Sequence, residues 1–189
     1  MFKLSVYLTL LLNNIMKKIL LLLLIIPMLS FSQENVTSFK VENGSQLVWD
    51  RVIQDNVDPK DYFQYLESTG YFSNITKTDS TFTANFKGIK CDYKAAGLTR
   101  MSLPIMYADS EYSGGAMIQV REGRYRVVLR NISMEMQATN FTTTLDLDEQ
   151  LNNNVKDGVI KKSFLKRPAL ALEVTLRNIF TKKESNDDW

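Results

Sequence analysis

Histidine is absent from the 189-residue sequence, and cysteine occurs once, at Cys91. Without histidine the chain cannot build a Ser-His-Asp triad, a Cys-His pair or an imidazole metal site. A single cysteine cannot form an internal disulfide, and we expect Cys91 to pack as a small buried hydrophobe. These absences leave a pair of carboxylates as the only acid–base catalyst that the composition readily permits, and they favour a protein that is not an enzyme.

The amino-terminal part has the features of a Sec-type signal peptide. A short positive segment (16–18) precedes an unbroken apolar run (19–29), and the small residues Ser30 and Ser32 follow at the two positions that a signal peptidase reads. Such a run reaches about 16 Å at 1.5 Å per residue, against a bilayer core of about 30 Å. We therefore predict that residues 1–32 are a signal peptide, cleaved between Ser32 and Gln33.

The alternative interpretation of this region is a transmembrane anchor over residues 4–29. It would place Lys17 and Lys18 near the middle of the bilayer, where each charge costs about 2.5–3.5 kcal/mol. Cleavage is therefore preferred, with residues 1–15 interpreted as an upstream extension from a mis-assigned start codon. The expected mature chain has no stable membrane span and lies in the periplasm or outside the cell.

The charge balance of the mature chain is close to neutral. Three of the 23 basic residues and none of the 21 acidic residues lie in residues 1–32, so residues 33–189 carry a net charge of −1. Such a domain has no overall electrostatic footprint for nucleic acid or for an anionic membrane. The lack of disulfides, with the Lys17-Lys18 pair, favours a bacterial envelope. The length favours a single domain.

The first part of the mature chain predicts a hairpin and a helix. Asn43-Gly44 lies between two apolar runs, which is typical of a β-hairpin turn. Asp58 and Pro59 fit the N-cap and the first position of a helix that ends at Gly70.

The next part predicts an antiparallel sheet. The apolar residues up to Leu129 have one parity and those after Asn131 the other, so a bulge is expected near Arg130-Asn131. Pro104 cannot donate to a ladder and marks an edge. The predicted strands are 72–77, 81–86, 116–121 and 124–136, with an extended stretch at 89–93 and a strand or an extended edge at 101–107.

An apolar stripe at helical spacing predicts a final helix that begins at Pro168. The expected fold class is α+β, a mostly antiparallel sheet with its helices packed on one face. The expected organisation is a flexible lead (33–38), a sheet-plus-helix domain (39–136), a polar connection (137–167), a carboxy-terminal helix (168–183) and a tail (184–189).

Four segments carry a resemblance to a known domain: FKVENGSQLVWDRVI (39–53), CDYKAAG (91–97), EGRYRVVLRNI (122–132) and the Ser-Phe-Ser-Gln cleavage context (30–33). In these segments the sequence resembles an uncharacterised domain of exported Bacteroidetes proteins that is described as having a TATA-binding-protein-like fold. The resemblance covers residues 39–136 and implies a fold and an exported location. It implies no active site, because the function of that domain is unknown. Nor does it imply DNA binding, which needs a basic face.

A row of arginines is the main candidate for a binding site. The predicted binding residues are Arg124, Arg126, Arg130 and Tyr125. One hypothesis is a clamp for an anion or carboxylate, with Arg121 and Arg100 nearby. The alternative is a solvated sheet face on which the arginines pair with acids such as Glu122 and Glu135.

Two further sets suggest other ligands. Tyrosines could stack a sugar or a peptide, although such rings more often pack under sheet edges. These are Tyr62, Tyr65, Tyr71, Tyr93, Tyr107 and Tyr112. Methionines could line an adaptable apolar cavity between the sheet and the last helix. These are Met101, Met106, Met117, Met134 and Met136.

The acidic residues give little support for a metal or a catalytic pair. Asp146 and Asp148 begin like a calcium loop, but Leu151 stands where glycine is required, so no metal and no cofactor is predicted. A pair such as Asp79 and Asp92 has no defined separation in the sequence.

Three functional hypotheses remain. The first is an exported, non-enzymatic binding module of the bacterial envelope that contacts a protein or a glycan through an open sheet face. The second is a carrier of a small apolar ligand between the sheet and the carboxy-terminal helix, and the third is a carboxylate-dependent hydrolase. A polar groove on the sheet favours the first, an enclosed apolar pocket the second, and two converging carboxylates the third.

Overall fold

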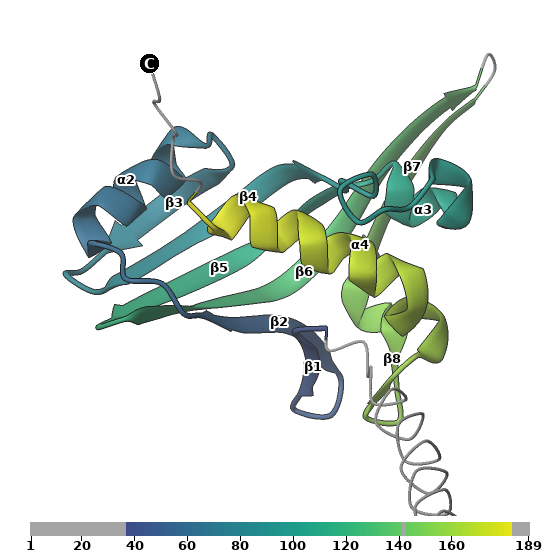
Figure 1. Cartoon of the computed structure of the whole chain (residues 1–189). Helices are drawn as coiled ribbons and strands as arrows, with labels where there is room; N and C mark the ends of the chain where they lie inside the picture. Colours follow the sequence, from purple (N-terminus) through teal and green to yellow (C-terminus); the bar gives the residue numbers. More distant parts are fainter. Residues whose placement is uncertain (1–36, 141–142, 183–189) are drawn as a thin grey trace, which may run out of the picture. The chain divides into compact units, whose positions relative to one another are not determined.

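The computed structural model describes residues 37–140 and 143–182 (Figure 1). Its main element is a seven-stranded sheet in the order β1-β2-β6-β5-β4-β3, and β7 pairs with the carboxy-terminal half of β6. The strands are β1 (Phe39–Glu42), β2 (Gln46–Ile53), β3 (Phe72–Lys77), β4 (Thr81–Lys90), β5 (Glu111–Arg121), β6 (Arg124–Asn140) and β7 (Thr143–Gln150), all antiparallel to their neighbours. The helices are α2 (Pro59–Ser68), α3 (Ile105–Ala108) and α4 (Lys162–Phe180). The predicted signal peptide with its Ser32–Gln33 cleavage position, most of the lead, and the tail lie outside the described residues.

The hairpin and the first helix form for the predicted local reasons. Asn43 and Gly44 both have left-handed backbones, with φ of 51° and 75°, as the tight turn between β1 and β2 requires. The Asp58 carboxylate accepts a hydrogen bond from the Asp61 amide at 3.0 Å and so caps α2, with Pro59 next to it. Gly70, at φ 76°, follows the end of the helix.

The helices pack on one face of the sheet. Trp49 of β2 stacks on Phe180 of α4 with ring centroids 5.9 Å apart, and Tyr62 of α2 lies 4.6 Å from Tyr125 of β6. Trp49 is paired with Leu129, which has the parity of Tyr125, so both contacts lie on the same face. In Figure 1, α4 crosses the strands on this face. The predicted α+β class is thus confirmed. We call the opposite side the helix-free face, because no helix of residues 37–140 or 143–182 covers it.

The predicted bulge in β6 is also present. Asn131 has φ of 52°, and the register between β5 and β6 shifts between Ser113 and Gly115. Leu129 before the shift and Ile132 after it are both buried, so the extra residue returns the apolar side chains to the core.

The prediction of a strand or an extended edge over residues 101–107 is wrong. A short 3₁₀ turn (Arg100–Ser102) and α3 take its place. The Pro104 carbonyl accepts hydrogen bonds from the amides of Tyr107 and Ala108, which turns the chain. The turn buries both residues, and this contribution exceeds the weak strand tendency of the segment.

The prediction that residues 137–167 form only a polar connection is wrong as well. Most of the segment continues β6 or forms β7, a 3₁₀ turn (Leu151–Asn154), β8 (Val155–Lys156) and β9 (Val159–Ile160). A strand made of polar residues is difficult to predict from the sequence, because it lacks the apolar alternation that marks a strand and forms by backbone pairing with its neighbour. Asp157 and Gly158, both at positive φ, form the turn between β8 and β9, and this Asp-Gly signal was overlooked.

The final helix begins at Lys162, not at Pro168, and ends at Phe180 rather than 183. Its first turns are held by Phe164, which is buried against Phe39 and Tyr107 at ring distances of 5.2 and 5.9 Å. Pro168 therefore lies inside the helix, where it gives up one hydrogen bond to the Phe164 carbonyl.

A buried carboxylate ties α4 to the start of the domain. Glu173 of α4 is 6% exposed and accepts hydrogen bonds from the Trp49 indole at 2.7 Å and from the Ser38 amide and hydroxyl at 2.9 and 3.0 Å. The Arg51 guanidinium donates to the same group at 2.5 Å. These four bonds satisfy the charge and fix the position of the helix on the sheet.

Candidate functional site

The predicted arginines lie on the helix-free face, in the row where β6 is flanked by β2 and β5. Val52 of β2 is opposite Arg126, and Gln119 of β5 is opposite the same residue on the other side. One pair further along, Arg121 is directly opposite Arg124, next to the hairpin turn that joins β5 to β6. The pairing of three strands therefore gathers cationic side chains at one end of this face.

Arg126 and Arg130 are already engaged. Arg126 donates two hydrogen bonds to the Asp50 carboxylate, at 2.8 and 2.5 Å, and Arg130 donates two to Glu42, at 3.0 and 3.2 Å. For these two arginines the structure therefore agrees with the hypothesis of a sheet face with arginine–acid pairs, and not with that of a free clamp for an anion. The acids are those of β1 and β2 rather than Glu122 or Glu135.

The pairing changes the acidity of Asp50. The Arg126 guanidinium, helped by the Lys40 ammonium and opposed by burial, lowers the pKa of Asp50 from 3.8 to about 2. A carboxylate with a lowered pKa stabilises the fold above its unfolded pKa, and this contribution is lost as pH falls through the folded pKa. The shift corresponds to about 2 kcal/mol, and solvent screening of the exposed cations reduces this to about 1 kcal/mol.

We expect Asp50→Asn to unfold more easily than the wild type by about 1 kcal/mol near neutral pH. The difference should shrink as pH falls from about 4 to about 2, because the wild-type carboxylate is then protonated too. Urea unfolding of both proteins across this range measures it. If the difference in free energy of unfolding between the two proteins stayed constant down to a pH of about 2, the lowered pKa of Asp50 would be contradicted.

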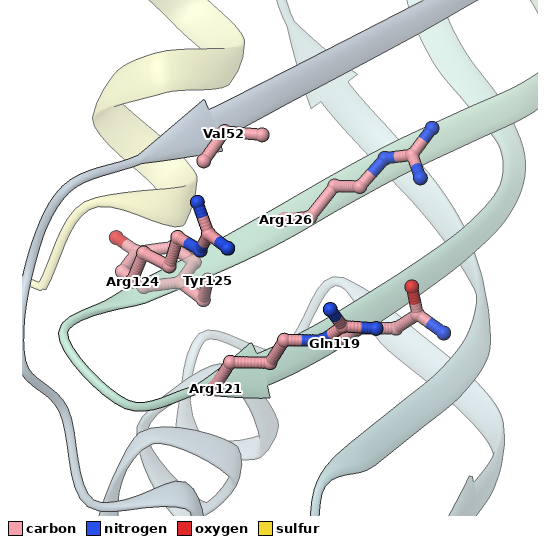
Figure 2. Close-up of a pocket in the computed structure, with 6 residues that line it drawn as sticks. All are labelled: Val52, Gln119, Arg121, Arg124, Tyr125 and Arg126. Carbon is pink, nitrogen blue, oxygen red and sulfur yellow. The ribbon is translucent and has the colours of Figure 1, made fainter.

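Arg121 and Arg124 differ from the other two arginines. Within the described part of the chain, neither has a hydrogen-bond or ion-pair partner. They line a shallow pocket of about 260 Å³, drawn in Figure 2, that we call the arginine pocket. Its lining is Val52, Gln119, Arg121, Arg124, Tyr125 and Arg126.

The arginine pocket suits a carboxylate. Like charges directly opposite each other on a sheet are destabilising, so the Arg121/Arg124 pair weakens the hairpin unless an anion lies between the two groups. Guanidinium groups bind carboxylates by two parallel hydrogen bonds. Val52 is 48% exposed and adds an apolar edge to the site.

The sequence identified this site only in part. Arg124 was predicted, and Arg121 was expected nearby, whereas Val52 and Gln119 were missed because only the pairing of three strands brings them together. Arg100 is not part of the site, because it forms an ion pair with Asp109 elsewhere.

Tyr125 does not present its ring beside the arginines. It is 1% exposed, and its hydroxyl donates to the Phe180 carbonyl at 2.8 Å on the helix-covered side. The Tyr62 hydroxyl donates to the same carbonyl at 2.6 Å, and burial raises the pKa of Tyr62 well above its ordinary range. The two hydroxyls satisfy a carbonyl at the carboxyl end of α4 that the helix itself leaves free.

The other candidate tyrosines also belong to the core. Every tyrosine between residues 37 and 182 lies in the hydrophobic core or packs against it. The arginine pocket therefore has no exposed aromatic ring among the residues that the structure describes.

Asp79 and Asp92, the candidate carboxylate pair from the sequence, do not lie together. Asp79 precedes β4 and Asp92 follows it, so a ten-residue strand of roughly 33 Å separates them. Paired catalytic carboxylates of glycosidases lie about 5–9.5 Å apart. Asp55, Asp58 and Asp61 border a pocket of about 200 Å³ with Lys182, but Asp58 is committed to capping α2. Over the described ranges, no group of three or more potential ligands is placed to hold a metal.

The space between the sheet and α4 is filled by aromatic rings. Phe180 contacts both Trp49 and Phe72, with ring centroids 5.9 Å away in each case. The methionines expected to line a cavity are dispersed, since Met134 is buried and Met101 is 96% exposed.

None of the described helices is long and apolar enough to cross a membrane.

Comparison with known proteins gave two structural neighbours. No family model matches the chain, and no curated protein matches it. A TBP-like protein from Parabacteroides distasonis is 13% identical, with a TM-score of 0.45 over 74% of this chain and 93% of that one. A DUF4468 family protein from Bacteroides ovatus is 10% identical, with a TM-score of 0.44 over 79% of this chain and 94% of that one. Neither name states a ligand or an activity.

Proposed function

We propose that the protein is a non-enzymatic binding module, exported to the bacterial envelope, that holds an acidic side chain of a partner protein in the arginine pocket. The observation that carries the proposal is the pair Arg121 and Arg124, placed directly opposite each other with no acid between them in the described chain. A partner carboxylate would remove their repulsion and form two charge-assisted hydrogen bonds.

A protein partner is favoured over a glycan. Sugars are commonly held against aromatic faces, and the helix-free face offers no exposed ring in residues 37–140 or 143–182. The pocket volume of about 260 Å³ is below the 300–1,000 Å³ typical of small-molecule sites, so one side chain fits it better than an oligosaccharide. Val52 provides an apolar contact beside the carboxylate.

Two sequence features support the rest of the proposal. The absence of histidine removes most acid–base and nucleophilic mechanisms, which favours binding over catalysis. The positive segment, the apolar run and Ser32 support export.

The test uses the protein recovered from its host's envelope, with its intact mass recorded. A mass that matches residues 33–189 supports export and cleavage at Ser32, and a mass that includes residues 17–29 contradicts it. The recovered protein is then titrated with poly-L-glutamate and with polygalacturonate at about 0.15 M salt.

We expect poly-L-glutamate to bind more tightly, and Arg121→Gln/Arg124→Gln to weaken it by about 10- to 100-fold, because hydrogen bonds to charged groups contribute about 1.5–3 kcal/mol. A matched control, Lys162→Gln/Lys166→Gln, removes the same charge from exposed positions of α4 and should retain binding. Equal losses in the two variants, or tighter binding of polygalacturonate, would overturn the proposal.

A further inference from the structure

A second charged surface lies at the start of α4, apart from the arginine pocket. Lys161, Lys162, Lys166 and Arg167 are all exposed. The sequence has no acidic residue from Gly158 to Leu172. None of the four cations has an ion-pair partner in the described part of the chain.

Helix stability does not explain this arrangement. The amino-terminal end of a helix carries a partial positive charge, which disfavours cations in the first turn. No acidic residue lies in that turn, and Lys161 at the N-cap position provides no side-chain hydrogen bond. Local rules of this kind are most often broken where a site has a function.

Exposed apolar side chains stand beside these cations. Met101 and Ile105, before and within α3, are 96% and 55% exposed. Arg167 donates a hydrogen bond to the Ser102 carbonyl at 3.2 Å, which joins the turn that carries Met101 to the basic end of α4. We call this the α3–α4 surface, and its members are Met101, Ile105, Lys161, Lys162, Lys166 and Arg167.

We propose that the α3–α4 surface docks the protein on an anionic lipid membrane. Basic side chains attract acidic headgroups, while apolar side chains at the same surface enter the boundary between headgroups and acyl chains. Met101 is 96% exposed, so its side chain projects into solvent. A projecting apolar side chain next to cations suits a membrane surface, where apolar side chains enter the boundary between headgroups and acyl chains.

The near-neutral net charge of the mature chain does not conflict with this proposal. The acidic residues that offset these lysines in the net charge lie elsewhere on the surface. Three of them, Asp55, Asp58 and Asp61, border a different pocket beside α2. Attraction to a surface falls off within about 8–10 Å in physiological salt, so the local patch matters more than the sum.

The test is vesicle flotation of the envelope-recovered protein, whose mass shows whether residues 1–32 are still attached. Vesicles contain phosphatidylcholine alone or with phosphatidylglycerol. We expect binding only to the anionic vesicles, and its loss at about 1 M salt. Lys162→Gln/Lys166→Gln should weaken it about 25-fold, from roughly fivefold per charge, and Met101→Gln should weaken it independently.

The matched control is Arg121→Gln/Arg124→Gln, which removes two charges from the arginine pocket and should bind vesicles as the wild type does. The proposal is overturned if the lysine variant binds vesicles unchanged, if both double variants lose binding equally, or if neutral vesicles bind as well. It is also overturned if Lys162→Gln/Lys166→Gln no longer binds poly-L-glutamate but still binds vesicles, because the α3–α4 surface is then a site for an acidic protein. Unchanged urea midpoints show that the variants are folded.

Discussion

Glu173→Ala should lower the free energy of unfolding by about 3 kcal/mol, the lower end of the cost of breaking a buried charged pair, because the Arg51 side chain left behind is 31% exposed. The substitution strips the Arg51 guanidinium of its carboxylate and leaves the Trp49 indole N–H without an acceptor. It also releases the backbone amide of Ser38, at the start of the described chain. Since domains of this size are stable by about 5–15 kcal/mol, the variant would lose much of its stability.

Urea unfolding measures this effect as a lower midpoint at constant slope. The control is Glu111→Ala, which removes an acid that pairs with Lys90 at the surface, with 43% of its side chain exposed. An exposed pair contributes about 0–1 kcal/mol, so the control should change stability little. If the two variants are equally stable, Glu173 does not anchor α4.

A part of the fold could be predicted from the sequence when the residues that determine it lie close together along the chain. The turn at Asn43-Gly44, the cap at Asp58 and the bulge at Asn131 depend on residues a few positions apart, and each was predicted correctly. Strand β7 depends on pairing with β6, whose register is set by the whole sheet, and it was missed. The early start of α4 was also missed, because Phe164 is held by Phe39, far away in the sequence.

In the candidate site, too, the features set by neighbouring residues could be predicted and those set by remote residues could not. The parity of β6 was enough to place the arginines on one face, but their partners come from β1 and β2. The sheet order is needed to show that Arg126 meets Asp50, whereas the pairing of Arg121 with Arg124 follows from the two-residue turn between the predicted strands. Tyr125 is the one residue that the sequence alone could have excluded, since it has the parity of the buried residues Val127 and Leu129.

The bulge offers a second prediction with a large effect. Gly114→Ala should destabilise the fold by about 3 kcal/mol, at the upper end for overpacking. A Cβ atom at Gly114 would lie 2.8 Å from the Arg130 carbonyl oxygen and 3.0 Å from two carbons of the Phe86 ring. Neither group can withdraw easily, because the carbonyl belongs to the backbone of β6 and Phe86 is buried.

Gly115→Ala is the matched control, because the neighbouring position has only the same carbonyl within reach, at 3.9 Å. This variant should be neutral, or more stable by about 0.4–1 kcal/mol through the lower entropy of its unfolded chain. The two substitutions add the same methyl group one residue apart, so their difference in urea midpoint measures the close approach of β5 and β6 alone. Equal stability of the two variants would mean that the register shift at Gly115 relaxes on substitution. The arginine pocket depends on the same β5–β6 register, so a shift of one residue would move Arg121 to the helix-covered face and abolish the pocket.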